Sequence, residues 1–287
     1  MKLNSESAVI DRSVGGSIVT RSVVGSPAGL FYGYVVDGMF NTEADFYTQD
    51  AEGNVIPVAR PVDQNGNLRP ISRDNIWIGD IKWKDLNGDG KITEDDRTFI
   101  GNPTPKFEFS INNTLTYKNF DLNVFIGGVY GNEIYNQLAR DLEAPMSNMG
   151  LLKTVSNFAQ IAMYDPALGE NNIKNVYVAN PGTLVPRVST ANVNSNNRLS
   201  DRFVEDGSYL RIRNISLGYK LPENLVKRAH IQSMRVYVNL QNIYTLTNYS
   251  GYDPEIGSRG QDALFSSIDY GRYPSPRIYT LGLNFNF

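Results

Sequence analysis

The sequence contains no cysteine and only one histidine, His230. Without cysteine the chain cannot form a disulfide framework, a thiolate nucleophile or a zinc site built on sulfur. His230 stands beside basic residues in LVKRAHIQ, a setting more typical of an exposed loop than of a catalytic base. The sequence also lacks a nucleophile elbow and a Gly-rich phosphate loop before a helix, so we predict that the chain is not an enzyme.

Long apolar runs and excess positive charge are missing as well. No window approaches the roughly 18 apolar residues of a transmembrane helix. The first twenty residues, MKLNSESAVIDRSVGGSIVT, lack the apolar centre of a secretory signal, which predicts either a cytoplasmic chain or a true beginning further upstream. A net charge of -3 excludes nucleic acid as the main partner, because phosphate binding requires a clustered basic surface.

Strict alternation of apolar and polar residues is the strongest signal that is present. In KFEFSINNTLTY the odd positions are mostly apolar and the even positions mostly polar, the period of a strand with one buried face. The final segment RIYTLGLNFNF alternates in the same way. Few stretches have a helical period, so the sequence predicts an all-β fold. Five long antiparallel strands are expected near residues 106–117, 120–131, 208–219, 233–244 and 277–287.

The expected strand 208–219 changes phase part-way. Leu210 and Ile212 alternate in one phase, whereas Ile215 and Leu217 alternate in the other. A β-bulge near Arg213 and Asn214 would keep all the apolar side chains on one face.

The length and the connections of these strands favour a membrane barrel over a soluble sheet. Each strand is about 10 to 12 residues long, close to what a tilted strand needs to cross a bilayer. Short turns alternate with long polar segments, expected as external loops at residues 33–105, 132–207 and 245–276. Aromatic residues near the strand ends fit an interfacial girdle. A soluble sheet with one solvated face remains the alternative.

Several long motifs resemble one family, the SusC/RagA group of TonB-dependent outer-membrane transporters of Bacteroidetes. The motifs are GSPAGLFYGYVVDGMF (25–40), the run from DLNGDGKITEDD to GNEIYN (85–136), SYLRIRNISLGYKLP (208–222), VYVNLQNIYTLTNYSGYDPE (236–255) and the aromatic terminus. The resemblance implies a 22-stranded barrel with an N-terminal plug. It also implies import of oligosaccharides or peptides captured by a SusD-like surface lipoprotein, with energy supplied to the plug by the TonB complex.

The resemblance covers the C-terminal part of the family only. We expect the signal peptide, plug and TonB-contacting segment to be absent, and five strands cannot close a barrel without the remaining barrel strands. The chain is therefore expected to be a fragment, a truncated record or one piece of a split barrel in outer-membrane lipid; a non-functional gene remnant is the alternative. The last strand resembles the family's membrane-assembly signal through Tyr279, Leu281, Leu283, Phe285 and Phe287.

The stretch DLNGDGKITEDD has the spacing of an EF-hand loop. Its predicted structural Ca²⁺ ligands are Asp85, Asn87, Asp89, Lys91 (through its backbone carbonyl), Thr93 and Asp96. Two features depart from the EF-hand pattern: the last ligand is Asp instead of Glu, and no flanking helices are evident. A loop closed by its own Asx turns would need the same residue types. A soluble or surface-attached, calcium-stabilised carbohydrate-binding β-protein is accordingly the alternative function.

Two further groups of residues leave alternatives open. Arg211, Arg213 and Arg235 either line a polar lumen or pair with nearby carboxylates. Aromatic residues of the long connections either stack on sugars or pack within the loops. These aromatic residues are Trp77, Trp83, Tyr164, Tyr177, Tyr249, Tyr252, Tyr270 and Tyr273.

Overall fold

The computed structural model describes residues 9–14, 17–144, 150–189, 193–227, 230–258 and 262–287. It divides the chain into two compact units. Unit 1 comprises Met1–Gly101, Tyr135–Val204 and Ser258–Ser266; unit 2 comprises Asn102–Ile134, Glu205–Gly257 and Ser267–Phe287. None of the described helices is both long and apolar enough to span a membrane.

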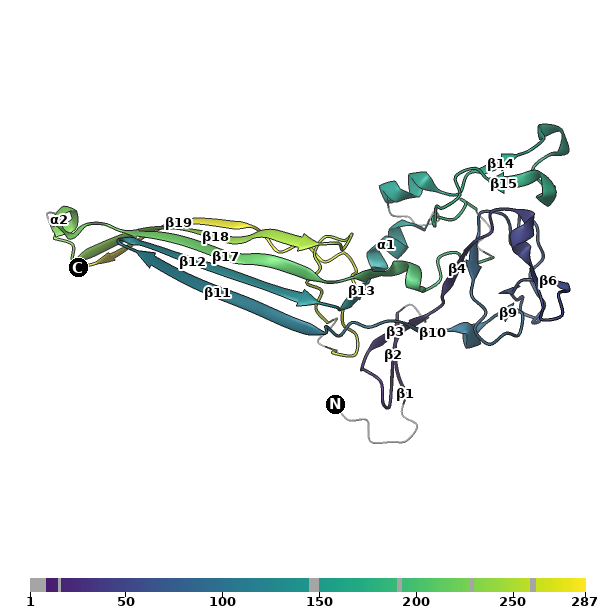
Figure 1. Ribbon diagram of the computed structural model, residues 1–287, viewed down its shortest axis with the longest axis horizontal. Coiled ribbons are helices and arrows are strands. Elements are labelled where there is room, and N and C mark those ends of the chain that lie inside the picture. The colour runs from purple at the N-terminus through teal and green to yellow at the C-terminus, as the bar shows by residue number, and fades with distance from the viewer. Residues whose placement is uncertain (1–8, 15–16, 145–149, 190–192, 228–229, 259–261) are drawn as a thin grey trace. The chain divides into compact units, whose positions relative to one another are not determined.

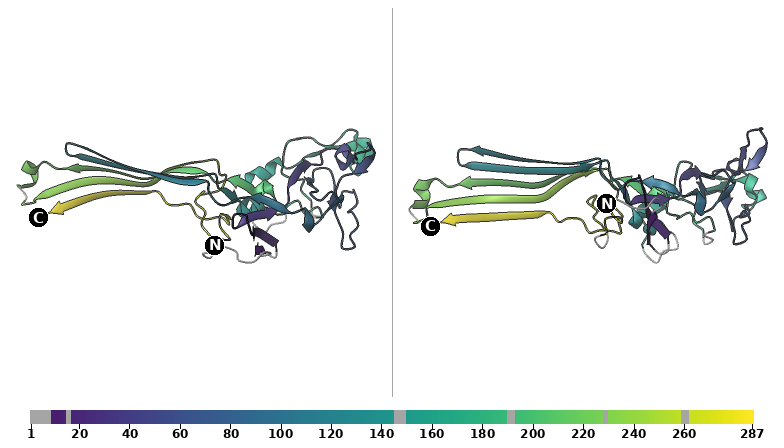
Figure 2. Two further views of the ribbon diagram at one scale, coloured as in Figure 1. Left: turned by 60° about the horizontal axis from the view of Figure 1, so that its bottom comes forward. Right: turned by 90° about the horizontal axis from the view of Figure 1, so that it is seen from below.

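Unit 2 is built on one antiparallel sheet of five long strands (Figure 1). The strands are β11 (Phe107–Tyr117), β12 (Phe120–Tyr130), β17 (Tyr209–Lys220), β18 (Ser233–Thr247) and β19 (Ile278–Asn286). Their order across the sheet is their order along the chain, and Figure 2 shows them side by side from two further directions. All five lie within three residues of the bounds that alternation predicts. A short helix, α2 (Glu223–Val226), lies in the connection between β17 and β18.

The register of the sheet collects the apolar side chains on one face. Residues paired across neighbouring strands point to the same side. One row of paired residues contains Leu115, Leu122, Leu217, Val238 and Leu281. The adjoining row contains Tyr117, Phe120, Tyr219, Val236 and Leu283.

This apolar face is open to its surroundings in unit 2. Leu115 is 59% exposed and Leu281 is 75% exposed, and Leu217 in the central strand is still 48% exposed. The opposite face carries rows of polar residues, among them Thr114, Asn123, Ser216, Asn239 and Thr280. The sheet therefore has one polar and one apolar face, and no described residues cover the apolar face.

The bulge expected from the sequence is confirmed. In the pairing with β12 the register shifts between Ile212 and Asn214, so that Arg213 is the extra residue of β17. Ile212 pairs with Ile126, and beyond the shift Ile215 pairs with Val124. Because the extra residue restores the phase, both halves of β17 present their apolar residues to the same face.

Unit 1 consists of short strands joined by turns. A four-stranded sheet contains β1 (Val9–Val14), β2 (Ser17–Val23), β3 (Leu30–Gly33) and β10 (Thr98–Gly101). Two-stranded pairs are β4 (Val36–Met39) with β8 (Ile81–Trp83), β5 (Tyr47–Gln49) with β6 (Val55–Pro57), β7 (Arg60–Pro61) with β9 (Lys91–Ile92), and β14 (Ile161–Met163) with β15 (Val176–Val178). The strands β13 (Glu133–Tyr135) and β16 (Val204–Asp206) cross the boundary between the units.

Helices in unit 1 are short. The one described α-helix of this unit is α1 (Gln137–Leu142), whose first turn is capped by the Asn136 side chain accepting from the backbone N–H of Ala139. The 3₁₀ turns are η1 (Glu43–Phe46), η2 (Glu94–Asp96), η3 (Lys153–Asn157), η4 (Pro166–Leu168), η5 (Ile173–Asn175) and η6 (Asp201–Phe203).

Unit 1 has its own hydrophobic core, which the sequence did not lead us to expect for segments taken as polar loops (33–105 and 132–207). Trp77 and Trp83 are 4% and 3% exposed, and the rings of Phe40 and Phe46 stack with centroids 4.2 Å apart. Trp77 and Trp83 are therefore core residues and not surface platforms. The other members of this cluster are Tyr34, Met39, Val58, Ile76, Ile78, Ile81, Ile92, Ala159, Val176 and Val178.

A buried ion pair joins distant parts of unit 1. The Nε of Arg187 donates to Oδ1 of Asp80 at 2.8 Å, and both side chains are almost fully buried. The Asp80 carboxylate also accepts from Asn196 Nδ2 and from the backbone N–H of Trp77. Since each oxygen of Asp80 has hydrogen-bond partners, the charge can remain buried and hold the two segments together.

Candidate functional site

The polar face of the sheet in unit 2 carries a cluster of charged side chains. The bulge places Arg213 beside Arg211, which pairs with Gly127 across β12 and so lies on the polar face. The sequence left open whether Arg211, Arg213 and Arg235 line a lumen or pair with carboxylates. All three form ion pairs, with Asp253, Glu255 and Asp121.

Arg211 is the centre of this cluster. Its side chain is only 4% exposed, and its three guanidinium nitrogens all donate. Nη2 donates to Asp253 Oδ1 at 2.5 Å, Nη1 to Glu255 Oε2 at 2.8 Å, and Nε to Thr245 Oγ1 at 2.9 Å. The segment 253–255 is thereby fastened to the wall formed by β17 and β18.

Asp253 is held in its ionised form. Burial acts to raise the pKa of this carboxyl, but hydrogen bonds from the backbone N–H groups of Ser275 and Glu255, together with Arg211, outweigh it and hold the pKa below its ordinary value. A single carboxylate thus connects three separate parts of unit 2.

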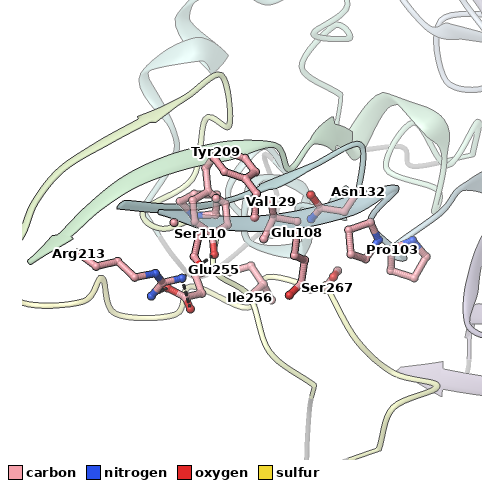
Figure 3. A pocket seen from close by; sticks show the side chains of 15 residues that line it. Pro103, Glu108, Ser110, Val129, Asn132, Tyr209, Arg213, Glu255, Ile256 and Ser267 are labelled. Atoms are coloured by element: carbon pink, nitrogen blue, oxygen red, sulfur yellow. Dashed lines mark hydrogen bonds and ion pairs between the residues drawn. The ribbon is translucent and has the colours of Figure 1, made fainter. Parts of the chain in front are cut away.

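A pocket of about 450 Å³ opens beside this cluster (Figure 3). Arg213 donates to Glu255 Oε1 at 3.2 Å and to the Tyr209 hydroxyl at 3.3 Å, and a Cβ at Gly127 would lie 3.0 Å from Arg213 Nε. The glycine therefore leaves room for the guanidinium at the pocket wall. Other polar groups that line the pocket are Glu108, Ser110, Asn132 and Ser267.

The chemistry of this pocket suits recognition of polar groups. Hydroxyl, amide, carboxylate and guanidinium groups supply both donors and acceptors for hydroxyl or amide groups of a ligand. Cysteine is absent from the chain, and its one histidine, His230, is not among the lining residues. Among the described lining residues the polar groups are hydroxyl, amide, carboxylate and guanidinium groups, without a thiol or an imidazole.

The predicted calcium loop is a compact turn in unit 1. The Asp85 carboxylate accepts from the backbone N–H groups of Gly88 and Gly90 at 2.7 and 2.8 Å. Asp96 is fully buried and accepts from the N–H groups of Leu86 and Thr93 at 3.0 and 2.7 Å, which closes the loop. Its side-chain oxygens thus hold the loop together by Asx-type hydrogen bonds.

The remaining predicted calcium ligands take part in the same pattern. Asn87 Oδ1 accepts from the N–H of Asp89, Asp89 Oδ1 accepts from the N–H of Lys91, and Thr93 Oγ1 accepts from the N–H of Asp95. An all-oxygen donor set is chemically suited to a hard cation. Within the described part of the chain, however, no three His, Cys, Asp or Glu side chains gather closely enough to hold a metal ion together. Calcium binding remains a prediction.

The proposed assembly-signal residues lie on the exposed apolar face. Along β19, Tyr279, Leu281 and Leu283 pair with Leu240, Val238 and Val236 of β18. Phe285 and Phe287 continue the same alternation, with ring centroids 6.4 Å apart. Alternation therefore predicted correctly that these five side chains share one face of the strand. Their role in membrane assembly remains a prediction.

Sequence reasoning missed the carboxylates that complete the charged cluster. Asp253 and Glu255 lie about 40 residues from Arg211, in a stretch without strand periodicity. The buried Tyr249, whose hydroxyl donates to Asp269 Oδ2 at 2.7 Å, was identified only as a loop aromatic. Both carboxylates lie in GYDPE, the end of a motif that resembles the family, but this motif does not indicate that they pair with Arg211.

The chain is similar in sequence to TonB-dependent receptors. It is 33% identical over 267 residues to the TonB-dependent receptor P3 of Formosa agariphila, covering 92% of the chain and 22% of that relative. It is 30% identical over 275 residues to receptor P26 of the same organism, covering 95% and 24%. It is 27% identical over 227 residues to the TonB-dependent receptor SusC of Bacteroides thetaiotaomicron, covering 78% and 18%. The chain thus spans about a quarter or less of the length of these relatives.

Solved structures share the fold. The RagAB peptide transporter matches with a TM-score of 0.56 at 19% identity, over 94% of this chain and 24% of the matched chain. The RagAB peptide importer in the closed-closed state matches with a TM-score of 0.57, over 96% and 25%. No protein-family model matches. The expected fold, antiparallel strands of a barrel transporter, is confirmed by this likeness, while the strand number of a whole barrel stays an expectation.

Proposed function

We propose that the chain forms part of the wall of an outer-membrane nutrient transporter, because its sequence and its barrel-strand fold are similar to those of SusC/RagA-family TonB-dependent receptors. The proposed cargo is an oligosaccharide or a peptide. The proposed partners are a SusD-like surface lipoprotein, the remaining barrel and plug segments, and the TonB complex acting through the plug. Outer-membrane lipid is the proposed contact of the apolar face of the sheet.

The observation that carries this proposal is the uncovered apolar face of the five-stranded sheet. Rows of aliphatic and aromatic side chains cross all five strands and are exposed even in the central strand, where Leu217 lies. Burying such a face against hydrocarbon is favourable by about 25 cal/mol for each Å² removed from water. The polar face with its ion pairs is suited to a wet interior.

The charged pocket supports a role in passing polar cargo. Arg211 and Asp253 fix the segment around Glu255 against the sheet, so the pocket walls are preorganised. Ligand groups that bind there would meet fixed donors and acceptors, which reduces the ordering cost of binding.

We also propose that the loop 85–96 binds Ca²⁺ as a structural clip. Asp85, Asn87, Asp89, Thr93 and Asp96 would supply side-chain oxygens and Lys91 its backbone carbonyl. Two features support the proposal: the spacing of these oxygens along the loop, and the hydrogen bonds by which Asp96 closes the loop. A calcium-stabilised carbohydrate-binding β-protein outside the membrane is the competing function, and it would need a protein partner over the apolar face.

An import assay tests the main proposal. Cells of the native host that carry the gene, and cells in which it is deleted, are given fluorescent oligosaccharide and oligopeptide pools. Gene-dependent uptake of one pool, abolished by a protonophore that removes the energy for TonB, is expected. Equal uptake of both pools by the two strains would contradict the proposal. Recovery of the chain as a monodisperse species without detergent would favour the competing function.

A further inference from the structure

A cavity of about 640 Å³ in unit 1 is lined by three arginines, Arg97, Arg140 and Arg198. The three come from separate parts of the chain: Arg97 precedes β10, Arg140 lies on α1, and Arg198 lies just before the bridge formed by Ser200. Other polar lining groups are Ser17, Tyr34, Thr93, Glu94, Ser195 and Asn197. Glu94 is the one carboxylate among the lining residues.

Arg97 is buried and only partly neutralised. Its Nη1 donates to Glu94 Oε2 at 2.9 Å, but the Glu94 side chain is 80% exposed while that of Arg97 is 5% exposed. Solvent screening weakens a pair with an exposed partner. The Nε of Arg97 is buried and has no hydrogen-bond partner among the described residues.

Arg140 and Arg198 form no ion pair with a carboxylate of the described residues. Arg140 donates from Nε to the carbonyl of Asn197 at 2.9 Å. The guanidinium carbon of Arg198 lies 4.8 Å from the ring centre of Tyr34 and 5.8 Å from that of Trp83. These contacts position the two side chains without neutralising their charges.

Two of the three guanidinium groups meet at one aromatic ring. The Tyr34 ring lies 5.9 Å from the guanidinium carbon of Arg97 as well as 4.8 Å from that of Arg198. Burial lowers the pKa of Arg198, against the opposing effects of Tyr34 and Glu94. Asp96 is the nearby buried carboxylate, but its two oxygens already accept backbone N–H groups. The cavity therefore has an excess of positive charge in a partly desolvated setting.

We propose that this cavity binds the oxyanion group of a small organic solute, as a carboxylate or a sulfate ester carried on a sugar-sized molecule. Guanidinium forks bind both groups through paired, charge-assisted hydrogen bonds. The side chains of Tyr34, Val62, Ile92 and Leu199, which also line the cavity, supply an apolar wall for the rest of the ligand. This proposal concerns ligand binding by unit 1 and is independent of import by the proposed transporter.

The test uses three sugars that differ at one position: galactose, galacturonate and galactose 6-sulfate. Binding to the purified full chain in neutral detergent is measured by titration calorimetry at low and at high ionic strength. One or both anionic sugars are expected to bind, with an affinity that falls as salt is added, while galactose does not. The two anionic arms distinguish a carboxylate from a sulfate ester. Equal binding of all three sugars, or binding of none, would overturn the proposal.

Substitutions locate the binding. Arg198→Met should weaken binding about tenfold or more, since a charge-assisted contact is lost. The matched control is Arg73→Met, which removes an equal charge from a half-exposed side chain outside the cavity. Glu94→Gln removes the competing carboxylate and should strengthen binding several-fold, a gain that misfolding cannot produce. Equal weakening by Arg73→Met and Arg198→Met, or no gain with Glu94→Gln, would overturn the assignment to this cavity.

Discussion

Arg235 on β18 reaches across β17 to pair with Asp121 on β12. Its Nε donates to Asp121 Oδ1 at 2.9 Å, and its Nη2 donates to Oδ2. Gly218 of β17 lies beneath this bridge, and a Cβ there would overlap the guanidinium. Gly218 has an ordinary strand conformation, so the glycine is needed for the space it leaves and not for its backbone freedom.

Gly218→Ala should therefore break the pair between Arg235 and Asp121. The two side chains are 29% and 35% exposed, so screening limits the loss of stability to about 0.5–1 kcal/mol. Asp121→Asn should cost a similar amount, and the double variant should cost little more than either single one. Thermal unfolding in detergent, followed by gel mobility, measures all three. Ser216→Ala on the same face is the control, and additive losses in the double variant would contradict the bridge.

A positive charge should reduce folding into the membrane at one residue of β17 and be tolerated at the residue next to it. Leu217→Arg places a cation on the apolar face and should cost about 2–4 kcal/mol if that face meets hydrocarbon. Ser216→Arg places the same cation on the polar face and should be tolerated. The fraction of the full receptor that folds into lipid vesicles gives the comparison. Equal folding of the two variants would show that the apolar face does not lie in the membrane.

Calcium should stabilise unit 1 if the loop 85–96 is a cation clip. At a calcium concentration a hundred times the dissociation constant, the gain is about 2.7 kcal/mol. Asp89→Asn removes one negative charge from the site and should lower the calcium affinity, so that more calcium is needed for the same rise in melting temperature. Asp63→Asn is the control, because Asp63 closes a similar turn by accepting from the N–H groups of Asn65 and Asn67. A melting temperature that calcium leaves unchanged would remove the proposal.

The buried pair Tyr249 and Asp269 should make unit 2 sensitive to alkali. Burial, together with the hydrogen bond to Asp269, raises the pKa of Tyr249 above its ordinary value. A raised pKa favours the protonated tyrosine in the folded state, so this contribution is complete below about pH 10 and is lost as the pH rises further.

Tyr249→Phe separates this effect from general alkaline unfolding. The variant should lose about 1–3 kcal/mol at neutral pH, because a buried acceptor of Asp269 loses its donor. Its stability should then fall less steeply above pH 10 than that of the wild type. Tyr252→Phe removes an exposed tyrosine and should keep the wild-type slope. Parallel pH profiles for the wild type and Tyr249→Phe would contradict the raised pKa.

Alternation predicted the five long strands, which are 9 to 15 residues long, because each has one polar and one apolar face and the period of two is interrupted only at register shifts. The phase change between Ile212 and Ile215 also located the bulge at Arg213 in the pairing with β12. These predictions depend only on neighbouring residues, which is the range over which sequence patterns carry information.

The core of unit 1 and the charged cluster were beyond that range. Strands such as β9, with two residues, are too short to show any period, so Ile92 gave no sign that it is buried. Arg211 pairs with Asp253 across 42 residues, and no local pattern records such a contact. The cavity of Arg97, Arg140 and Arg198 likewise brings together three distant segments.

The most direct test of the barrel-wall account places single cysteines at Val238 and Asn239 in the assembled receptor. The chain has no cysteine of its own, so each nitroxide label attached there reports one position. Val238 and Asn239 are consecutive in β18 and belong to the apolar and the polar row. We predict that the label at 238 is relaxed by oxygen dissolved in the bilayer and the label at 239 by a water-soluble nickel complex. Relaxation of both labels by the nickel complex alone would contradict the account.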